Sequence, residues 1–183
     1  MNRIFGITRG ISVPDGTTVY PFLNSKDETS GLPWDLTDGF SLSAGVVAPK
    51  SASRIHVMPL VTQVAFVLDG AIEVWMKDPE NPEPYKQSLT SRQAILTRPG
   101  GFLQFVNTSM SLCWLLYIVS PAYMFELDDE GKVAYDDSII LNEDWPQLRA
   151  LNWCPPGLPE VGAMQRAREA SAARLAAGSR STS

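Results

Sequence analysis

Short apolar runs alternate with turn-forming residues over most of the chain between residues 40 and 119. Runs of this length, in which apolar positions recur every second residue, are typical of β-strands, whereas a helix needs apolar residues three and four positions apart. Seven short strands separated by turns predict a β-sandwich or a β-barrel. The predicted strands cover residues 40–47, 63–68, 71–76, 93–97, 102–106 and 112–119, together with a strand that contains His56.

The segment 54–70 contains the only histidine of the chain, His56. Because side chains alternate between the two faces of a strand, Arg54, His56 and Met58 are expected to share one face. The segment ends at Asp69-Gly70, a pair that is typical of the tight turn in a β-hairpin. A cluster of polar side chains is therefore expected within an otherwise apolar sheet.

Shorter elements are expected on both sides of the barrel. Before it, the Pro-Asp-Gly sequence at 14–16 predicts a turn between strands at 3–11 and 17–22, and residues 24–39 predict a loop. After it, two strands are expected to pair around a turn, and two helices follow. These later elements are strands at 123–127 and 132–135, a short helix at 144–151 capped by Asp144, and a helix at 160–177 with a thin apolar face.

This pattern divides the chain into three parts. We expect N-terminal strands and a loop at 1–39, a β-barrel at 40–125, and a C-terminal extension with a helix at 126–183.

Composition and charge narrow the class of protein. At 183 residues, 44% of them hydrophobic, the chain is long enough to bury a core, and its formal net charge of −5 argues against nucleic-acid binding. No window holds the ~18 to 20 apolar residues that span a bilayer, and no signal peptide is evident at the start. We therefore expect a cytoplasmic protein with neither nucleic acid nor a membrane as partner. Cys113 and Cys154 have no metal-type spacing and are expected to be free thiols.

Two segments resemble the motifs of the cupin superfamily. Residues 49–70 resemble the first motif, in which a proline and a glycine precede two histidines one residue apart, a glutamate follows, and a glycine closes the strand. Residues 98–107 are similar to the second motif, which has a proline and a glycine, then a histidine, then an asparagine. The resemblance implies an all-β, cupin-type double-stranded β-helix (a jelly-roll barrel) with a short C-terminal helical extension.

The residues at the metal-binding positions depart from the family pattern. Carried over position by position, the family's ligands fall on His56, Met58, Gln63 and Gln104, and Lys50 stands where a glycine is usual. A neutral set with one imidazole, a thioether and two amides compensates a hard dication poorly. We therefore expect either no cofactor or a single metal ion at His56, Gln63 and Gln104, with copper or iron as the metal. Glu73 or Asp69 would supply the missing charge only if its strand bent inward.

Each candidate residue has a structural as well as a functional interpretation. His56 is either a core histidine hydrogen-bonded to the two amides or a proton shuttle, and the amides bond to each other and to His56 or else hold a ligand. Arg54 would clamp a carboxylate. The candidate catalytic residues are His56, Gln63, Gln104, Glu73 and Tyr117, with Tyr123 as a further proton carrier. The candidate substrate-binding residues are Arg54, Met58, Trp75, Phe102 and Trp114.

Three functions remain open at this point. The first is an enzyme that isomerises, cyclises or eliminates from a small, largely apolar organic metabolite by acid–base chemistry, and the resemblance implies a tailoring step in biosynthesis. The second is a metal-dependent oxygenase with an unusual centre of His56 and glutamines. The third is a non-catalytic module that binds or senses a small molecule.

A homodimer is also expected. An open barrel leaves strand edges that association can cover, so the strand at 4–11 is predicted to pair with a second subunit.

Overall fold

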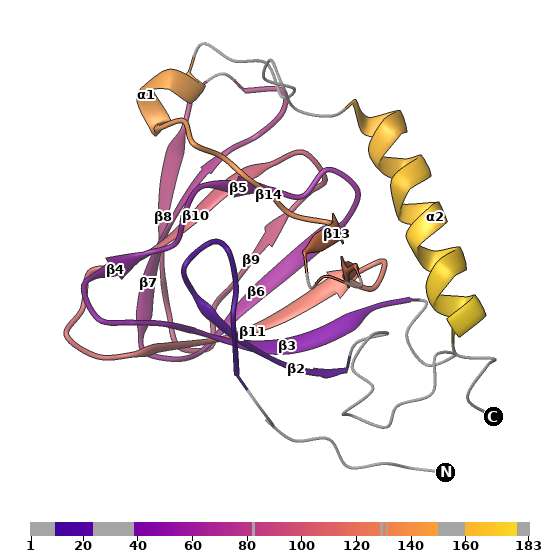
Figure 1. The fold of residues 1–183 in the computed structure, drawn as a ribbon. Helices are drawn as coiled ribbons and strands as arrows, with labels where there is room; N and C mark the ends of the chain where they lie inside the picture. The colour runs from indigo at the N-terminus through magenta and orange to yellow at the C-terminus, as the bar shows by residue number, and fades with distance from the viewer. Residues whose placement is uncertain are drawn as a thin grey trace.

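Two antiparallel β-sheets face each other and hold the main apolar core between them (Figure 1). The computed structural model describes residues 10–23, 39–81, 83–128, 130, 132–149 and 160–178. The strands are β1 (Ile11–Ser12), β2 (Thr18–Leu23), β3 (Ser41–Val47), β4 (Ser51–Ala52), β5 (His56–Val57), β6 (Thr62–Asp69), β7 (Ala71–Lys77), β8 (Tyr85–Thr90), β9 (Ala94–Thr97), β10 (Phe102–Asn107), β11 (Cys113–Ser120), β12 (Phe125–Leu127), β13 (Val133–Asp136) and β14 (Ile139–Ile140). The helices are α1 (Trp145–Leu148) and α2 (Val161–Gly178).

The chain passes repeatedly from one sheet to the other. The first sheet has the order β1-β2-β3-β11-β6-β9, and the second has the order β14-β5-β10-β7-β8, with β4 also paired to β10. After β3 in the first sheet come β4 and β5 in the second, then β6 in the first, β7 and β8 in the second, and β9, β10 and β11 in alternate sheets. This path is a double-stranded β-helix, and the all-β prediction is confirmed.

The predicted elements of the barrel are present, and the strands β4, β8 and β14 were not predicted. Each of the seven expected strands corresponds to an observed one, and the Asp69-Gly70 turn joins β6 to β7 with Gly70 at φ +91°. Strand β8 has no apolar alternation because it lies at the edge of its sheet and buries only Leu89. Residues 1–9, 24–38 and Cys154 lie outside the described residues, and with them most of the predicted strands at 3–11 and loop at 24–39.

Lys50 adopts the backbone conformation that explains the glycine of the first cupin motif. Its φ is +53°, in the left-handed region that costs a residue with a side chain about 1 kcal/mol or more. The Lys50 Nζ donates to the carbonyl oxygen of Thr108 at 2.6 Å, and its backbone N–H donates to that of Ser109 at 3.2 Å. These two bonds hold the lysine in a turn where glycine is the unstrained choice.

A second apolar cluster lies on the outer side of β5 and β10, where α1 covers it (Figure 1). The cluster contains Ile55, Val57, Phe102, Leu141 and Leu148. Helix α1 begins at the predicted cap: the Asp144 carboxylate accepts from the backbone N–H of Gln147 at 3.0 Å, and the Gln147 side chain accepts from that of Asp144 at 2.8 Å. This reciprocal pair is a capping box.

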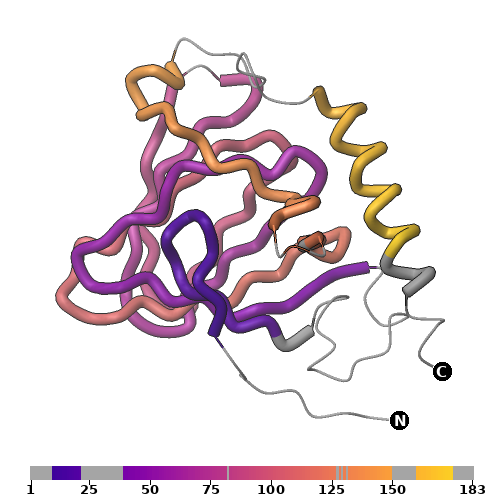
Figure 2. Tube along the Cα trace, in the orientation of Figure 1, coloured from indigo at the N-terminus to yellow at the C-terminus, as the bar shows by residue number. Residues whose placement is uncertain are grey.

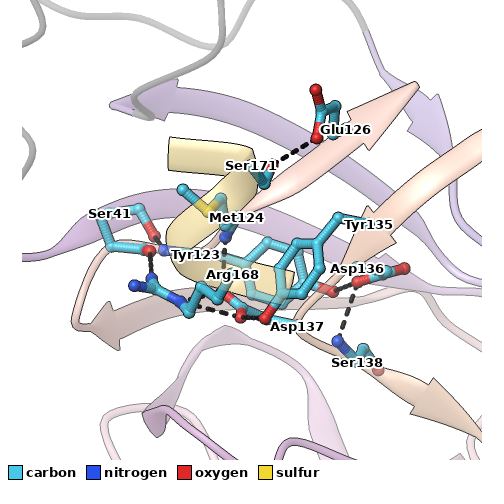
Figure 3. A network of polar contacts seen from close by, with 11 residues as sticks. Ser41, Tyr123, Met124, Glu126, Tyr135, Asp136, Asp137, Ser138, Arg168 and Ser171 are labelled. Carbon is cyan, nitrogen blue, oxygen red and sulfur yellow. Dashed lines mark hydrogen bonds and ion pairs between the residues drawn. The ribbon is translucent and has the colours of Figure 1, made fainter. Parts of the chain in front are cut away.

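Helix α2 is joined to the β12–β13 hairpin by charged and polar groups (Figure 3). The guanidinium of Arg168 lies 3.0 Å from the carboxylate of Asp137, which is fully buried, and also donates to the carbonyl oxygen of Ala122 at 2.5 Å. Glu126 accepts from Ser171 at 2.5 Å and from Arg174 at 2.6 Å. The predicted helix is therefore confirmed, and its thin apolar face is supplemented by two ion pairs.

Two further expectations concern membrane-spanning helices and the state of the Cys113 thiol. No helix within the described ranges has the length and hydropathy needed to cross a membrane. Cys113 is a buried free thiol, as expected, and burial raises its pKa to about 11.

Gly45 allows the ring of Tyr117 to lie against β3. A Cβ atom at position 45 would overlap this ring, with the hydroxyl oxygen at 2.9 Å and Cζ at 2.8 Å. We expect Gly45→Ala to lower the free energy of unfolding by about 1–3 kcal/mol, as overpacked core variants do. Gly39→Ala is the control, because no atom lies within 4 Å of a Cβ at that position. Urea denaturation that finds the two variants equally stable would contradict this packing.

The Arg168–Asp137 pair gives a second test of the fold. Arg168→Leu leaves the buried Asp137 carboxylate without its cation, so we expect a loss of about 3–5 kcal/mol in the free energy of unfolding. Arg166, which is exposed on the same helix, supplies the matched control, and Arg166→Leu should change stability by less than about 0.5 kcal/mol. Thermal and urea unfolding measure both, and equal effects would show that the ion pair does not anchor α2.

Candidate functional site

A cavity of about 660 Å³ lies inside the barrel. Both sheets contribute to its walls, as do the β1–β2 and β12–β13 hairpins, and apolar side chains form most of the surface. Cavities of this size are typical of sites for small organic ligands. The polar side chains that can take part in chemistry there are Asp15, His56, Gln63, Tyr117, Tyr123 and Asp136.

His56 presents a neutral imidazole to the cavity. Its Nδ1 lies 3.1 Å from the carbonyl oxygen of Arg54, and since a carbonyl only accepts, Nδ1 carries the proton. Burial lowers the pKa of His56, while the Asp15 charge and the Arg54 carbonyl act in the opposite direction. The Nε2 atom therefore has a free lone pair near neutral pH and can accept a proton.

The β1–β2 hairpin brings Asp15 to this histidine. Figure 2 shows the hairpin crossing the front of the barrel, and the backbone N–H of Arg54 donates to the carbonyl oxygen of Asp15 at 2.6 Å. The turn needs Gly16, whose φ is +89°. The result is a distance of 4.0 Å between the Asp15 carboxylate and Nδ1 of His56.

Gln63 and Tyr117 are buried polar groups whose side chains have no hydrogen-bond partner among the described residues. They lie on the inner face of neighbouring strands: Gln63 is opposite Val119 in the β6–β11 register, two residues from Tyr117. Their exposed fractions are 7% and 6%, and both line the cavity. Burial, followed by the charges of Asp15 and Cys113, raises the pKa of Tyr117, so its hydroxyl stays protonated. Both groups can therefore donate to a ligand.

Asp136 and Tyr123 form a second proton-carrying pair on the cavity wall. The Tyr123 hydroxyl and the backbone N–H of Ser138 both donate to Oδ1 of Asp136. Burial raises the pKa of Asp136 to about 6, although these two hydrogen bonds oppose the shift, and the charges of Asp137 and Asp15 add to it. A carboxyl group with this pKa can both accept and donate a proton near neutrality.

The neighbouring Asp137 shows how the hairpin is held in place. In Figure 3 the two carboxylates point to different partners, Asp136 to Tyr123 and Asp137 to Arg168 and Tyr135. Asp137 also accepts from the backbone N–H of Met124 at 2.7 Å, which ties the strand to its hairpin partner. This network fixes β13 against α2 and leaves Asp136 facing the cavity.

The prediction that Gln104 shares the cavity with His56 and Gln63 is wrong. The side chains of β10 that face the barrel interior are Leu103 and Phe105, so alternation turns Gln104 outward. There its amide donates to the carbonyl oxygen of Ser53 at 2.8 Å and accepts from the indole N–H of Trp145 at 2.8 Å. Gln104 is part of the support for α1, whereas His56 and Gln63 do line one cavity.

Arg54 and Glu73 also lie outside the cavity. Arg54 precedes β5, so the alternation that places His56 and Met58 on one face does not extend to Arg54. The Arg54 side chain is exposed and donates a hydrogen bond to Asn142 at 2.6 Å. Glu73 is on the outer face of β7, 3.1 Å from Lys86. The expectations that Arg54 clamps a carboxylate in the barrel and that Glu73 carries protons there are therefore wrong.

The predicted aromatic binding residues pack elsewhere, and two other predicted residues do line the cavity. Trp75 stacks on Trp145 on the outer face of the second sheet, with ring centroids 6.3 Å apart, and Trp114 stacks on Tyr20 at 5.6 Å. Phe102 is fully buried in the cluster under α1. The residues found in the cavity as expected are Met58 and Tyr117.

The donors present do not fit the metal centre of the cupin motifs. Within the described part of the chain, no group of three or more His, Cys, Asp or Glu side chains is placed to hold a metal ion. Of the predicted ligands His56, Gln63 and Gln104, the last points away from the barrel interior. The remaining imidazole and neutral amide are a weak donor set for a dication.

Sequence reasoning missed Asp15 and Asp136 as site residues. Asp15 belongs to a Pro-Asp-Gly turn, a sequence that predicts a turn at any surface, and Asp136 ends a strand in the C-terminal extension. Neither position carries a local signal for the barrel interior, because both reach it through tertiary contacts.

Comparison with known proteins supports the fold rather than a particular activity. No protein-family model and no curated protein matches the sequence. Among solved structures, oxalate decarboxylase from Lactobacillus farciminis in a formate complex is 11% identical with a TM-score of 0.53, over 73% of this chain and 33% of that one. KdgF from Halomonas sp. is 14% identical with a TM-score of 0.51, over 71% of this chain and 99% of that one.

A third similar structure is a protein complex. Drosophila melanogaster CENP-C bound to CAL1 is 13% identical with a TM-score of 0.50, over 61% of this chain and 79% of that one. The chain spans only about a third of the length of the oxalate decarboxylase. The order in which the strands alternate between sheets, together with these similarities, shows that the chain has the double-stranded β-helix fold of the cupin superfamily.

Proposed function

We propose that this protein is an enzyme that acts on a small, largely apolar organic molecule by acid–base chemistry in the barrel cavity. One observation carries the proposal: His56, a neutral base, and Asp136, a carboxyl group with a pKa of about 6, line the same cavity. Pairs of titratable groups whose environments set different protonation states are typical of acid–base sites. Structural neighbours of this fold include proteins named as enzymes, such as oxalate decarboxylase.

The proposed reaction moves a proton from one atom of the substrate to another. Nε2 of His56 accepts a proton from carbon or oxygen, and Asp136, hydrogen-bonded to Tyr123, delivers a proton at the second atom or to a leaving group. Gln63 and Tyr117 donate hydrogen bonds to the oxygen on which negative charge develops, a role in which Tyr117 replaces the predicted Gln104. The products are an isomer, a ring, or an alkene with a released leaving group.

The cavity walls favour an apolar substrate. Val19, Met58, Phe105 and Val119 line the cavity around the polar groups, and the ring of Phe105 lies 5.8 Å from that of Tyr117 and 6.5 Å from that of His56. Removing water from such a site strengthens every hydrogen bond made inside it. A tailoring step in a biosynthetic pathway would suit this cavity.

Binding without catalysis is the second candidate function. Gln63 and Tyr117 would hold a ligand equally well in a sensing protein, and CENP-C, which is similar in fold, was solved bound to CAL1. The oxygenase hypothesis depended on Gln104 as a metal ligand and is not carried forward. A cytoplasmic location and a homodimer stay predictions from the sequence.

Deuterium incorporation tests the proposed chemistry. The protein is incubated in D₂O with a metabolite extract of the organism that encodes it, and mass spectrometry follows every compound. We expect one metabolite to be converted to an isomer, a cyclic product or an elimination product, with a non-exchangeable deuteron in every product in which the proton is returned to carbon. His56→Ala and Asp136→Asn should each slow this conversion by about 100-fold or more, as loss of a general base or acid does.

Glu73→Gln is the control, since Glu73 lies on the outer face and should not affect turnover. Retention of a metabolite without any conversion would favour the binding function. Incorporation of oxygen from O₂ would overturn the proposal in favour of an oxygenase.

The protonation state of His56 is open to a direct test because it is the only histidine of the chain. We expect its ring protons to titrate in NMR spectra with a pKa below 6.5, because burial disfavours the charged imidazolium. Asp15→Asn should lower this pKa further, since Asp15 raises it in the native protein. An unchanged or higher pKa in Asp15→Asn would show that the carboxylate does not act on the ring.

A further inference from the structure

No cationic side chain among the described residues lies beside the two carboxylates in the cavity. Oδ1 of Asp15 accepts from the backbone N–H and the hydroxyl of Thr17, at 2.9 and 2.7 Å, while Oδ2 lies 4.0 Å from Nδ1 of His56 and has no hydrogen bond to a described residue. Asp136 likewise uses Oδ1 for Tyr123 and Ser138, and its Oδ2 has no hydrogen bond to a described residue. Each carboxylate is thus anchored by one oxygen, and within the described part of the chain the other oxygen accepts no hydrogen bond.

Two other buried carboxylates are paired with cationic side chains. Asp137 is paired with Arg168, and Glu126 with Arg174. No lysine or arginine is among the described residues that line the cavity, and the neutral His56 supplies no full charge. Burying an uncompensated carboxylate in apolar surroundings is costly, so a counter-charge from a ligand would stabilise the site.

We propose that the cavity binds a small, apolar molecule that carries a protonated amine, whose ammonium group pairs with Oδ2 of Asp15 and, while that carboxyl group is ionised, with Oδ2 of Asp136. The inference rests on the proposed function in taking this cavity as the substrate site, and it adds the charge of the substrate. Asp15 is one of the charges that raise the pKa of Asp136, which is consistent with both carboxylates acting on one ligand group.

Two independent features of the cavity point to an organic ligand. Gln63 and Tyr117, both more than nine-tenths buried, turn polar groups without partners among the described residues into the cavity, where they can bond to the rest of the molecule. Phe105, Tyr117 and Tyr123 line the cavity, and aromatic rings attract organic cations. A divalent metal ion would need more anionic or imidazole donors than the described residues bring together.

Three ligands of similar shape and different charge test the proposal. Phenethylamine, phenethyl alcohol and phenylacetate are titrated into the full-length protein at neutral pH, and the NMR signals of the single histidine report binding. We expect the amine to bind at least about tenfold more tightly than the alcohol, because hydrogen bonds to charged groups are stronger. Phenylacetate should bind more weakly than the alcohol, since like charges repel.

Variants assign the preference to the two carboxylates. Asp15→Asn and Asp136→Asn should each reduce the preference for amine over alcohol, whereas Asp69→Asn, at an exposed position of β6, should leave it unchanged. If a variant fails to fold, the comparison of the three ligands on the unmodified protein still tests the proposal. Equal or tighter binding of phenylacetate, displacement of the amine by Mg²⁺ or Zn²⁺ at lower concentration, or an unchanged preference in both folded variants would overturn the proposal.

The outcomes separate this inference from the proposed function. Preferential amine binding without any conversion in D₂O would support the charge assignment and defeat the enzyme proposal. Conversion of a neutral or anionic metabolite, with weak amine binding, would do the reverse.

Discussion

The alternation of side chains along each strand decides which polar groups reach the interior of this barrel. In β10, Leu103 and Phe105 face inward, and Gln104 between them faces α1. In β6 and β11, Gln63 and Tyr117 occupy inward positions in the same register. Because the period is two, a shift of one residue would exchange these sets completely. The chemistry of the cavity therefore depends on strand register as much as on residue type.

This constraint also explains how far the sequence could be interpreted. Seven of the barrel strands and the Asp144 cap of α1 depend on neighbouring residues, and both were predicted. The face of Gln104 was not, because a match to a short motif tolerates a shift of one position that a strand does not. Strand β8 was missed because an edge strand with one buried residue has no apolar alternation. Asp15 and Asp136 come from segments outside the motifs, and only tertiary contacts bring them to the cavity that His56 lines.

The adjacent residues Asp136 and Asp137, at the end of β13, have different roles: Asp137 attaches the strand to α2, and Asp136 faces the cavity. Asp137 is enclosed by hydrogen bonds and by Arg168, so its charge is compensated within the protein. Asp136 faces the cavity with one oxygen that has no hydrogen bond to a described residue, and burial raises its pKa. Helix α2 thus contributes to the site without touching the cavity, since it holds the strand from which Asp136 projects (Figure 3).

The hairpin that carries Asp15 forms part of the cavity wall and also supplies a charge near the imidazole. Its tip is attached to the chain before β5 through the backbone bond between Arg54 and Asp15. Any displacement of this tip would shift that part of the cavity wall and remove the carboxylate from His56 in a single movement. The shape of the cavity and the electrostatic state of the base are thereby mechanically coupled.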